Sequence, residues 1–205
     1  MITLHHLNQS RSKRIIWLLE ELGVEYTIRP YQRDSVSFLA PPELKSVHPL
    51  GKSPVIEEDG KVITESGAIT EHLISKYGAQ TLAPEAGSDD YLDYLQWLHF
   101  AESSAALPLL LKLFVAKDGA ETNFLGDYAE AEIDKVMSYV NQRLEGKRYL
   151  VADKLTGADI MLSFIVDILA NFGILERYEN IARYAKQLAT HEAYRAAEKL
   201  EQHYG

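Results

Sequence analysis

Two short polar motifs in this chain carry side chains that could hold a small zwitterionic peptide. The first motif, Gly51–Ile56, places Ser53 and Pro54 where a loop enters a strand. Proline at such a point indicates a fixed turn, and a cis Ser53–Pro54 bond would turn the Ser53 backbone N–H and C=O outward, toward an extended peptide. The second motif, Glu65-Ser66-Gly-Ala-Ile, puts a carboxylate and a hydroxyl at a helix start, where helix N–H groups and the dipole favour an anion. Together the motifs predict a site for a small zwitterionic peptide.

The composition excludes several kinds of chemistry. The 205 residues include no cysteine, so disulfides, thiolate metal sites and a protein thiol nucleophile are excluded, and any thiol must come with the substrate. A formal net charge of −9 argues against nucleic acid as a partner, because non-specific binding needs clustered Lys and Arg. His5 and His6 are adjacent in an expected strand and point to opposite faces, and the other histidines stand alone. We therefore expect no metal site.

The sequence does not predict a membrane protein. We find no apolar run that reaches the roughly 18 residues needed to span a bilayer. The segment Met1–Leu7 also lacks the basic start and the long apolar stretch of a signal peptide. We therefore expect a cytoplasmic protein.

Residues 1–79 alternate strand and helix signals. Apolar residues at helical spacing predict helices over Ser10–Gly23 and Ser66–Tyr77, and a short helix is expected around Pro42–Ser46. A short apolar run predicts a strand at Ile2–Leu7, and an alternating pattern predicts one at Tyr26–Tyr31. The segments Val55–Glu58 and Lys61–Thr64 flank an Asp-Gly hairpin signal and are predicted to be strands. The order β-α-β followed by β-β-α is that of a thioredoxin-like domain.

The rest of the chain shows a linker followed by helical signals only. A linker containing Pro and Gly is expected over residues 79–89, and from residue 88 to residue 205 the periodicity is helical. The expected helices are Tyr91–Lys112, Tyr128–Glu145, Thr156–Asn171, Ile181–Leu188 and Glu192–Tyr204. The sequence therefore predicts an α/β plus all-α protein, with a thioredoxin-like domain at 1–79 and an all-helical domain at 88–205.

The segment Thr156-Gly-Ala-Asp159 precedes an apolar run in the second part. A Thr followed three residues later by an acid is the pattern of a capping box, in which both side chains pair with backbone N–H groups at a helix start. We assign Thr156 and Asp159 to folding rather than to chemistry.

The two polar motifs, in this order and separated by the hairpin signal Asp59-Gly60, closely resemble the glutathione-binding half of cytosolic glutathione S-transferases. The cap and helical pattern of the second part extend the resemblance over essentially the whole chain. It implies that Ser53 and Pro54 pair with the cysteinyl backbone of glutathione, while Glu65 and Ser66 hold its γ-glutamyl end.

The resemblance also suggests a contact for the glycyl carboxylate of glutathione, and it implies which co-substrate takes part. Lys52 could reach the glycyl carboxylate of glutathione, and the alternative is an exposed loop lysine. Glutathione is then the co-substrate, and no metal takes part.

A transferase of this kind must generate a thiolate near neutral pH. The serine-type, bacterial-like members of the family carry a serine four residues before an Arg that opens an apolar helix, and Ser10 stands four residues before Arg14. Ser10 is therefore the candidate that donates a hydrogen bond to the thiolate, with Asn8 and Ser12 as substitutes. The structural alternative is that Ser10 only caps the helix.

The resemblance implies a homodimer that conjugates glutathione to a small hydrophobic electrophile. Candidate walls for the electrophile are Leu7, Leu107, Leu110, Leu111 and Phe114, although such residues are more often core residues. A glutathione-dependent peroxidase or reductase activity is a variant that needs no protein cysteine. Two alternatives remain open: a non-catalytic regulatory or interaction module, and a glutathione-dependent isomerase.

Overall fold

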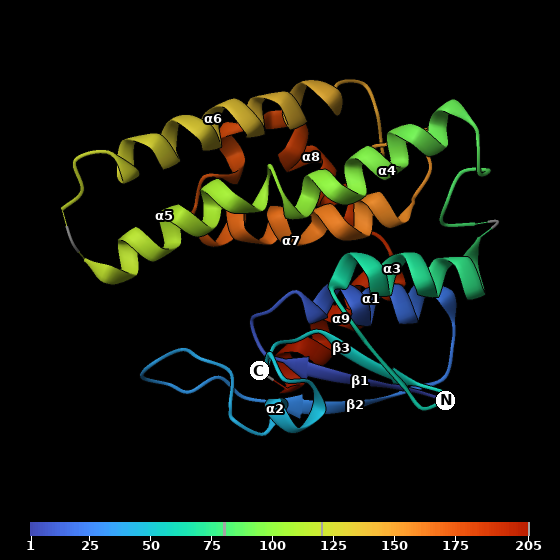
Figure 1. Ribbon diagram of the computed structural model, residues 1–205. Coiled ribbons are helices and arrows are strands. Elements are labelled where there is room, and N and C mark those ends of the chain that lie inside the picture. Colours follow the sequence, from blue (N-terminus) through green and yellow to red (C-terminus); the bar gives the residue numbers. More distant parts are fainter. Residues whose placement is uncertain (80, 120, 205) are drawn as a thin grey trace. The chain divides into compact units, whose positions relative to one another are not determined.

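The computed structural model describes residues 1–79, 81–119 and 121–204, and the chain divides into two compact units (Figure 1). Unit 1 comprises Met1–Ala83 and Ala189–Gly205, and unit 2 comprises Pro84–Leu188. The linker expected over residues 79–89 contains Gln80, which lies outside the described residues.

Unit 1 contains, among its described residues, a four-stranded sheet in the order β2-β1-β3-β4. The strands are β1 (Ile2–Leu7), β2 (Tyr26–Tyr31), β3 (Val55–Glu58) and β4 (Lys61–Thr64). β1 runs parallel to β2 and antiparallel to β3, and β3 pairs antiparallel with β4. All four strands have the predicted bounds, and the predicted thioredoxin-like arrangement is confirmed.

Two helices cover one face of this sheet, α1 (Ser12–Leu22) and α3 (Ser66–Leu73) (Figure 1). α1 begins two residues later than predicted because Arg11 occupies its N-cap position, and it ends at Gly23, which has a left-handed φ of 62°. α3 continues into a single π-helical turn, Ile74–Gly78. The short α2 (Leu44–Val47) precedes the loop that leads to β3.

The last helix, α9 (Glu192–Tyr204), belongs to unit 1. It packs against α1, where Trp17 meets Tyr194 edge-on with ring centroids 5.0 Å apart. The sequence pattern predicts this helix as part of the all-helical domain at 88–205, whereas it belongs to unit 1. The difference arises because helical periodicity shows that a helix has an apolar face but not which element covers that face.

Unit 2 is helical, with α4 (Asp89–Glu102), α5 (Ala106–Asp118), α6 (Leu125–Arg143), α7 (Gly157–Asn171) and α8 (Glu179–Leu188), and a 3₁₀ turn at Leu175–Arg177. α7 supplies much of its core, and α4 packs against α7 while α5 packs against α6.

The prediction of a single helix over Tyr91–Lys112 was wrong, because the chain forms a turn over residues 103–105. The cause is Pro108: in a continuous helix its ring would clash with the carbonyl of the residue four positions earlier. Starting a new helix at Ala106 places the proline within the first turn, where proline is tolerated.

The segment Asp89–Asp118, which spans α4 and α5, is long and apolar enough to cross a membrane by length and composition, with a mean hydropathy of 1.3 in its most apolar window. The expectation that the chain contains no such run is therefore wrong for this segment. Core helices of soluble proteins meet the same criterion, and 33% of this window is buried inside the protein.

The predicted capping box at the start of α7 is confirmed. The Thr156 side chain accepts a hydrogen bond from the helix backbone, and an Asp159 carboxylate oxygen accepts the Thr156 N–H at 2.8 Å. Asp159 is fully buried and also accepts the Leu150 N–H at 3.0 Å and the Tyr184 hydroxyl at 2.8 Å. The carboxylate therefore joins the helix start to a preceding loop and to α8.

Candidate functional site

The loop between β1 and α1 carries a pair of hydroxyl groups. The Ser10 Oγ lies 2.8 Å from the Ser12 Oγ and accepts the Ser12 backbone N–H at 3.1 Å. Ser10 thus contacts the first turn of α1, although Arg11 is the N-cap residue. An 11-residue helix presents the positive end of its dipole here, which favours an anion beside Ser10.

The other two candidates in this loop are placed differently. Ser12 has no exposed surface, whereas Ser10 is 7% exposed. The Asn8 side-chain oxygen accepts the Arg33 N–H at 2.9 Å, and the Asn8 carbonyl accepts a hydrogen bond from the Arg33 guanidinium at 3.1 Å. Ser12 is therefore the least accessible of the three candidates, and the side-chain oxygen of Asn8 is engaged by Arg33.

The loop before β3 contains the predicted cis Ser53–Pro54 peptide bond, and this prediction is confirmed. The Ser53 hydroxyl donates to the His5 carbonyl at 2.8 Å and accepts the Leu7 N–H at 3.2 Å, so its side chain is tied to β1. Any hydrogen bond from Ser53 to a peptide therefore falls to its backbone. Pro54 is buried, and Lys52 is exposed beside it.

Glycine is strongly favoured at position 51 in the same loop. Its φ is +58°, and a Cβ at this position would lie 2.8 Å from the Lys45 side chain. Both the left-handed backbone and the close approach of α2 make a larger residue unfavourable.

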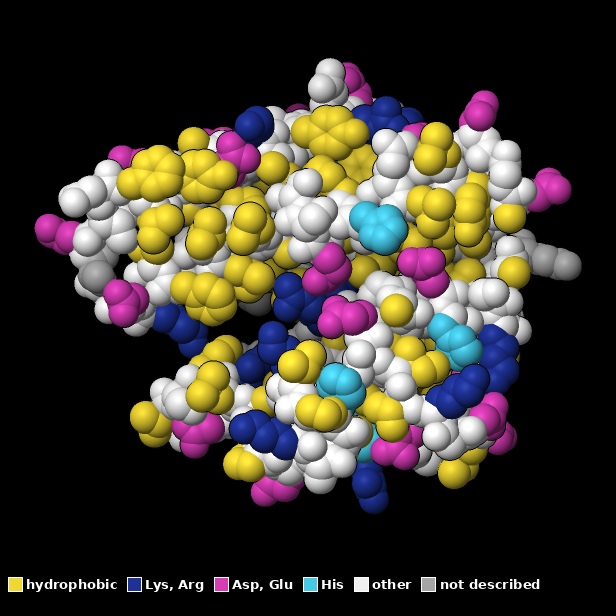
Figure 2. Space-filling view, in the orientation of Figure 1, with side chains coloured by type: hydrophobic (Ala, Val, Ile, Leu, Met, Phe, Trp, Pro, Cys, Tyr) yellow, Lys and Arg dark blue, Asp and Glu magenta, His cyan; other side chains and the backbone are white. Residues whose placement is uncertain are grey.

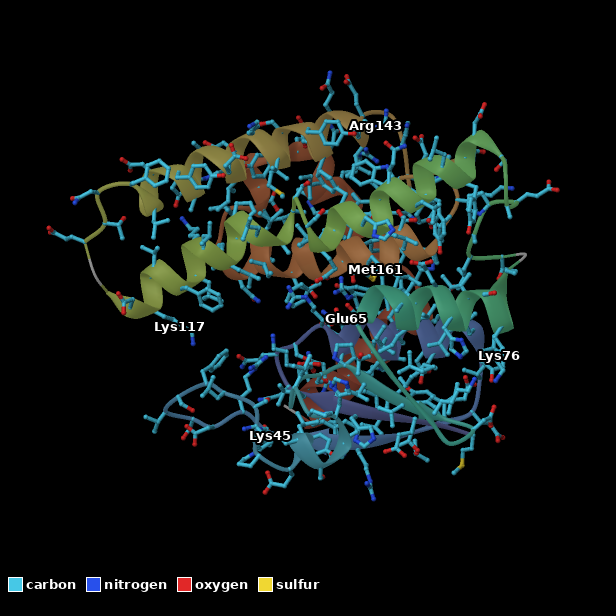
Figure 3. All side chains as sticks on the ribbon, in the orientation of Figure 1. Lys45, Glu65, Lys76, Lys117, Arg143 and Met161 are labelled. Carbon is cyan, nitrogen blue, oxygen red and sulfur yellow. The ribbon has the colours of Figure 1, made fainter. Side chains whose placement is uncertain are left out.

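Glu65 and Ser66 lie at the start of α3 (Figure 3). Glu65 is exposed at the N-cap position of α3. Its φ of 64° and ψ of 114° form a backbone conformation that residues other than glycine rarely adopt. Such strain costs about 1–3 kcal/mol and is concentrated at functional sites. Neighbouring Ser66 is buried, and its hydroxyl oxygen accepts a hydrogen bond from the Arg14 guanidinium at 2.7 Å.

Arg14 is the residue that sequence reasoning missed. In the sequence Arg14 only marks the position of Ser10, yet in the structure it is 1% exposed and joins α1 to α3 through Ser66. Because Arg14 donates to the Ser66 oxygen, the Ser66 hydroxyl hydrogen can point toward an anion at the start of α3. The available signal was a charged residue at the start of an apolar helix, since a buried cation requires a partner.

A second cluster holds α3 on the sheet. Glu58 of β3 is 4% exposed and pairs with His72 of α3 at 2.5 Å, with Lys76 at 3.0 Å and with the Tyr77 hydroxyl at 2.5 Å. Although burial opposes ionisation, hydrogen bonds from His72, Tyr77 and Lys76 lower the pKa of Glu58 to about 2. Glu58 thereby fixes the helix whose N-terminus carries Glu65 and Ser66.

The candidate walls for a hydrophobic substrate have different environments. Leu7 is 3% exposed and belongs to the core of unit 1, so its position gives no support to a role in substrate contact. Leu107 and Phe114 of α5 are 57% and 59% exposed, and Leu110 and Leu111 are half-buried.

Unit 2 contains a groove of about 550 Å³, and Leu107 and Leu111 line it together with Phe100, Tyr128 and Tyr139. Hydrophobic side chains gather over the α5 and α6 part of this unit (Figure 2).

A metal centre is not apparent in the described part of the chain. Among residues 1–79, 81–119 and 121–204, no group of three or more His, Cys, Asp and Glu side chains is placed to hold a metal ion. His5 bonds to Tyr31 and Glu57, whereas His6 bonds to Ser12, so the two adjacent histidines have separate partners.

Comparison with known proteins supplies the family. Residues 1–75 match the family model of the glutathione S-transferase N-terminal domain, and residues 92–192 match that of the C-terminal domain. Glutathione S-transferase 3 of Schizosaccharomyces pombe is 33% identical, over 98% of this chain and 88% of the relative. Glutathione S-transferase 1 of Saccharomyces cerevisiae is 32% identical, over 97% of this chain and 94% of the relative.

Solved structures agree with the family models. A glutathione S-transferase from Actinobacillus pleuropneumoniae superposes with a TM-score of 0.89 at 38% identity, over 98% of this chain and 93% of that chain. A glutathione transferase homologue from Lodderomyces elongisporus, solved with two GSH per subunit, has the same fold at 20% identity, with a TM-score of 0.84 over 97% and 98% of the two chains. This chain belongs to the glutathione S-transferase family.

Proposed function

We propose that this protein binds glutathione in unit 1, stabilises its thiolate, and conjugates it to a small hydrophobic electrophile. The observation that carries the proposal is the Ser10 hydroxyl beside the N-terminal turn of α1, in a chain without cysteine. The sulfur that reacts must then come from glutathione. Structures of relatives that contain glutathione, including Ure2p and the Lodderomyces homologue, support the choice of this thiol.

The loop between β1 and α1 can supply the free energy that is needed to stabilise the thiolate. A free thiol has a pKa of about 8.5, and lowering it by roughly two units requires about 2.7 kcal/mol of preferential stabilisation of the thiolate. A hydrogen bond to a charged acceptor contributes about 1.5–3 kcal/mol. The helix N-terminus adds about 0.3–1 kcal/mol. Ser10 and α1 together therefore supply enough stabilisation.

The start of α3 is the proposed site of the γ-glutamyl end. Ser66 would donate to the α-carboxylate with Arg14 behind it, and the exposed Glu65 carboxylate would pair with the α-ammonium group. The Ser53 backbone would pair with the cysteinyl part, and Lys52 would approach the glycyl carboxylate. One tripeptide would then engage both motifs and bring its sulfur to Ser10.

Titration of the purified protein with glutathione tests the proposal. We expect calorimetry to detect binding, and we expect the 240 nm thiolate absorbance of the complex to have a midpoint well below the pKa of about 8.5 of a free thiol. Binding without a thiolate band would indicate a non-catalytic module. A thiolate band with turnover of peroxides or isomerisable substrates, but not of electrophiles, would assign the same site to a different reaction.

Replacing Glu65 separates binding from backbone strain. Glu65→Ala should raise the dissociation constant for glutathione about 10- to 100-fold, the equivalent of about 1.5–3 kcal/mol for a lost charged hydrogen bond. Glu65→Gly should weaken binding to a similar degree but raise the free energy of unfolding by about 1 kcal/mol relative to Glu65→Ala, because glycine adopts a positive φ without strain. Calorimetry and urea denaturation measure the two effects.

The control for Glu65 is Glu71→Ala, which removes an exposed carboxylate from the same helix. Its dissociation constant should remain that of the wild type. Unchanged binding in both Glu65 variants would remove Glu65 from the glutathione site.

A further inference from the structure

The loop between β1 and α1 contains one backbone donor that the fold does not use. The Asn8 N–H donates to the Tyr31 carbonyl at 3.2 Å, and the Gln9 N–H donates to a Glu201 carboxylate oxygen at 2.7 Å. In the part of the chain that the structure describes, the Ser10 N–H donates to no other group, although Ser10 is only 7% exposed. Because buried backbone N–H groups are nearly always paired, this donor is available to an acceptor that a ligand brings.

Arg33, two residues after the end of β2, holds the carbonyl groups of the same loop. Its Nε donates to the Asn8 carbonyl at 3.1 Å, and its Nη2 donates to the Gln9 carbonyl at 3.3 Å. Its own backbone N–H donates to the Asn8 side-chain oxygen at 2.9 Å. A single arginine therefore fixes both peptide units that precede Ser10.

The Arg33 guanidinium is itself held in place. Its Nη1 donates to the Phe38 carbonyl at 3.0 Å, and its central carbon lies 4.9 Å from the centre of the Phe38 ring. Burial lowers the pKa of Arg33, while the charge of Glu201 raises it and the charge of Arg11 lowers it. Glu201 and Arg11 are thus charged neighbours of the guanidinium, and both stay the same in each variant considered below.

The contacts of Arg33 determine where the Ser10 N–H points. The peptide bond between Gln9 and Ser10 is trans, so its carbonyl and its N–H point in opposite directions. Because the Gln9 carbonyl accepts a hydrogen bond from Arg33, the Ser10 N–H points away from the guanidinium. The N–H and the hydroxyl of Ser10 belong to the same residue, so both can reach one acceptor.

We propose that Arg33 is a positioning residue that orients the Gln9–Ser10 peptide unit, so that the Ser10 N–H donates a second hydrogen bond to the thiolate that the Ser10 hydroxyl contacts. The inference rests on the proposed function, because the acceptor is the sulfur of bound glutathione. Hydrogen bonds to a charged acceptor are stronger than those to a neutral one, so a fixed N–H favours the thiolate over the thiol. Arg33 acts through Ser10 and does not need to touch the ligand.

The amide resonance of Ser10 tests the second hydrogen bond without any substitution. In the complex of the wild type with glutathione, we expect the Ser10 amide proton to move downfield with the same pH midpoint as the 240 nm thiolate band. The Gln9 amide proton already donates to Glu201, so it is the internal control and should move far less. A Ser10 amide proton that does not follow the thiolate band would overturn the proposal.

Replacing Arg33 tests the positioning. Arg33→Met keeps a long side chain but removes the donors, so the ionisation midpoint of bound glutathione should rise by about one pH unit, a tenfold change in the ionisation constant, while the dissociation constant changes by no more than a few-fold. Arg33→Lys retains the charge but lacks the planar fork that holds two carbonyls, so it should restore only part of the shift. Arg29→Met removes an exposed arginine from β2 and is the matched control, with an unchanged midpoint.

A Ser10→Ala background separates the N–H from the hydroxyl. Alanine retains the backbone N–H, so Arg33→Met should raise the midpoint by a similar amount in this background. A shift that disappears there, or that Arg33→Lys restores completely, would overturn the proposal, because Arg33 would then act through the hydroxyl or through its charge alone. A large loss of affinity without a shift would overturn it too, by placing Arg33 in contact with the ligand. A wild type without a thiolate band contradicts the proposed function itself, whereas a normal band with an unmoved Ser10 amide contradicts this inference alone.

Discussion

Replacing Ser10 with Ala should raise the ionisation midpoint of bound glutathione by about one to two pH units, while the dissociation constant changes by no more than a few-fold. The midpoint rises because the variant loses a hydrogen bond to a charged acceptor, worth about 1.5–3 kcal/mol. Affinity persists because the peptide contacts are assigned to other residues, in the loop before β3 and at the start of α3. At a pH between the two midpoints, the rate of conjugation should fall about 10- to 100-fold, in line with the lost thiolate.

The measurement is the 240 nm absorbance of the complex as a function of pH, combined with calorimetry. Ser35→Ala is the matched control, because Ser35 is an exposed serine elsewhere in unit 1. Ser10→Thr retains a hydroxyl and should restore part of the shift. If Ser10→Ala leaves the midpoint unchanged, Ser10 supports only the first turn of α1, and Asn8 becomes the next candidate.

Replacing Asp159 with Asn should lower the free energy of unfolding by about 1–3 kcal/mol, a substantial part of the total stability of a typical domain. One carboxylate oxygen accepts from Leu150 and Tyr184, and the other accepts from the backbone and hydroxyl of Thr156. An amide has one oxygen, so its NH₂ group must face a backbone N–H of Leu150 or of Thr156. That buried donor is then left unsatisfied.

Urea denaturation at low temperature measures this change. Asp118→Asn is the control, because Asp118 is exposed at the end of α5 and its replacement should change stability by about 0.5 kcal/mol or less. A loss below about 1 kcal/mol in Asp159→Asn would show that the network does not need the carboxylate.

Asp159 should also make the free energy of unfolding depend on pH. Burial raises the pKa of Asp159 to about 6, although Leu150, Thr156 and Tyr184 donate hydrogen bonds to it. The ordinary Asp pKa in an unfolded chain is about 3.9, so the folded state binds the proton more tightly between pH 4 and 6. The contribution of Asp159 is therefore complete below pH 4 and is lost as pH rises through 6, a decrease of about 3 kcal/mol.

The pH profile of the Asn variant isolates this contribution. His6 produces the opposite trend, because burial lowers its pKa from about 6.5 to about 4, so stability falls as pH falls between these two values. Subtracting the profile of Asp159→Asn from that of the wild type removes the His6 contribution. A flat difference between pH 4 and 6 would contradict the raised pKa.

The sequence by itself determined the parts of this protein that depend on neighbouring residues. The four strands of unit 1 follow from apolar or alternating patterns over a few residues and from the Asp59-Gly60 turn. The capping box follows from the spacing of Thr156 and Asp159, and the proline motif predicted the cis Ser53–Pro54 bond. Each of these features is encoded in fewer than ten consecutive residues, so a linear pattern is sufficient to reveal it.

The tertiary structure decided which distant groups meet. Arg14 contacts Ser66, 52 positions later, and Glu201 contacts Gln9 across 192 positions. α9 joins unit 1 although its periodicity resembles that of the other helices. Periodicity shows that a helix has an apolar face, but the partner of that face depends on how the whole chain packs. Buried polar groups also require partners wherever the fold brings them, and for this reason the support behind Ser10 and Ser66 was not apparent in the sequence.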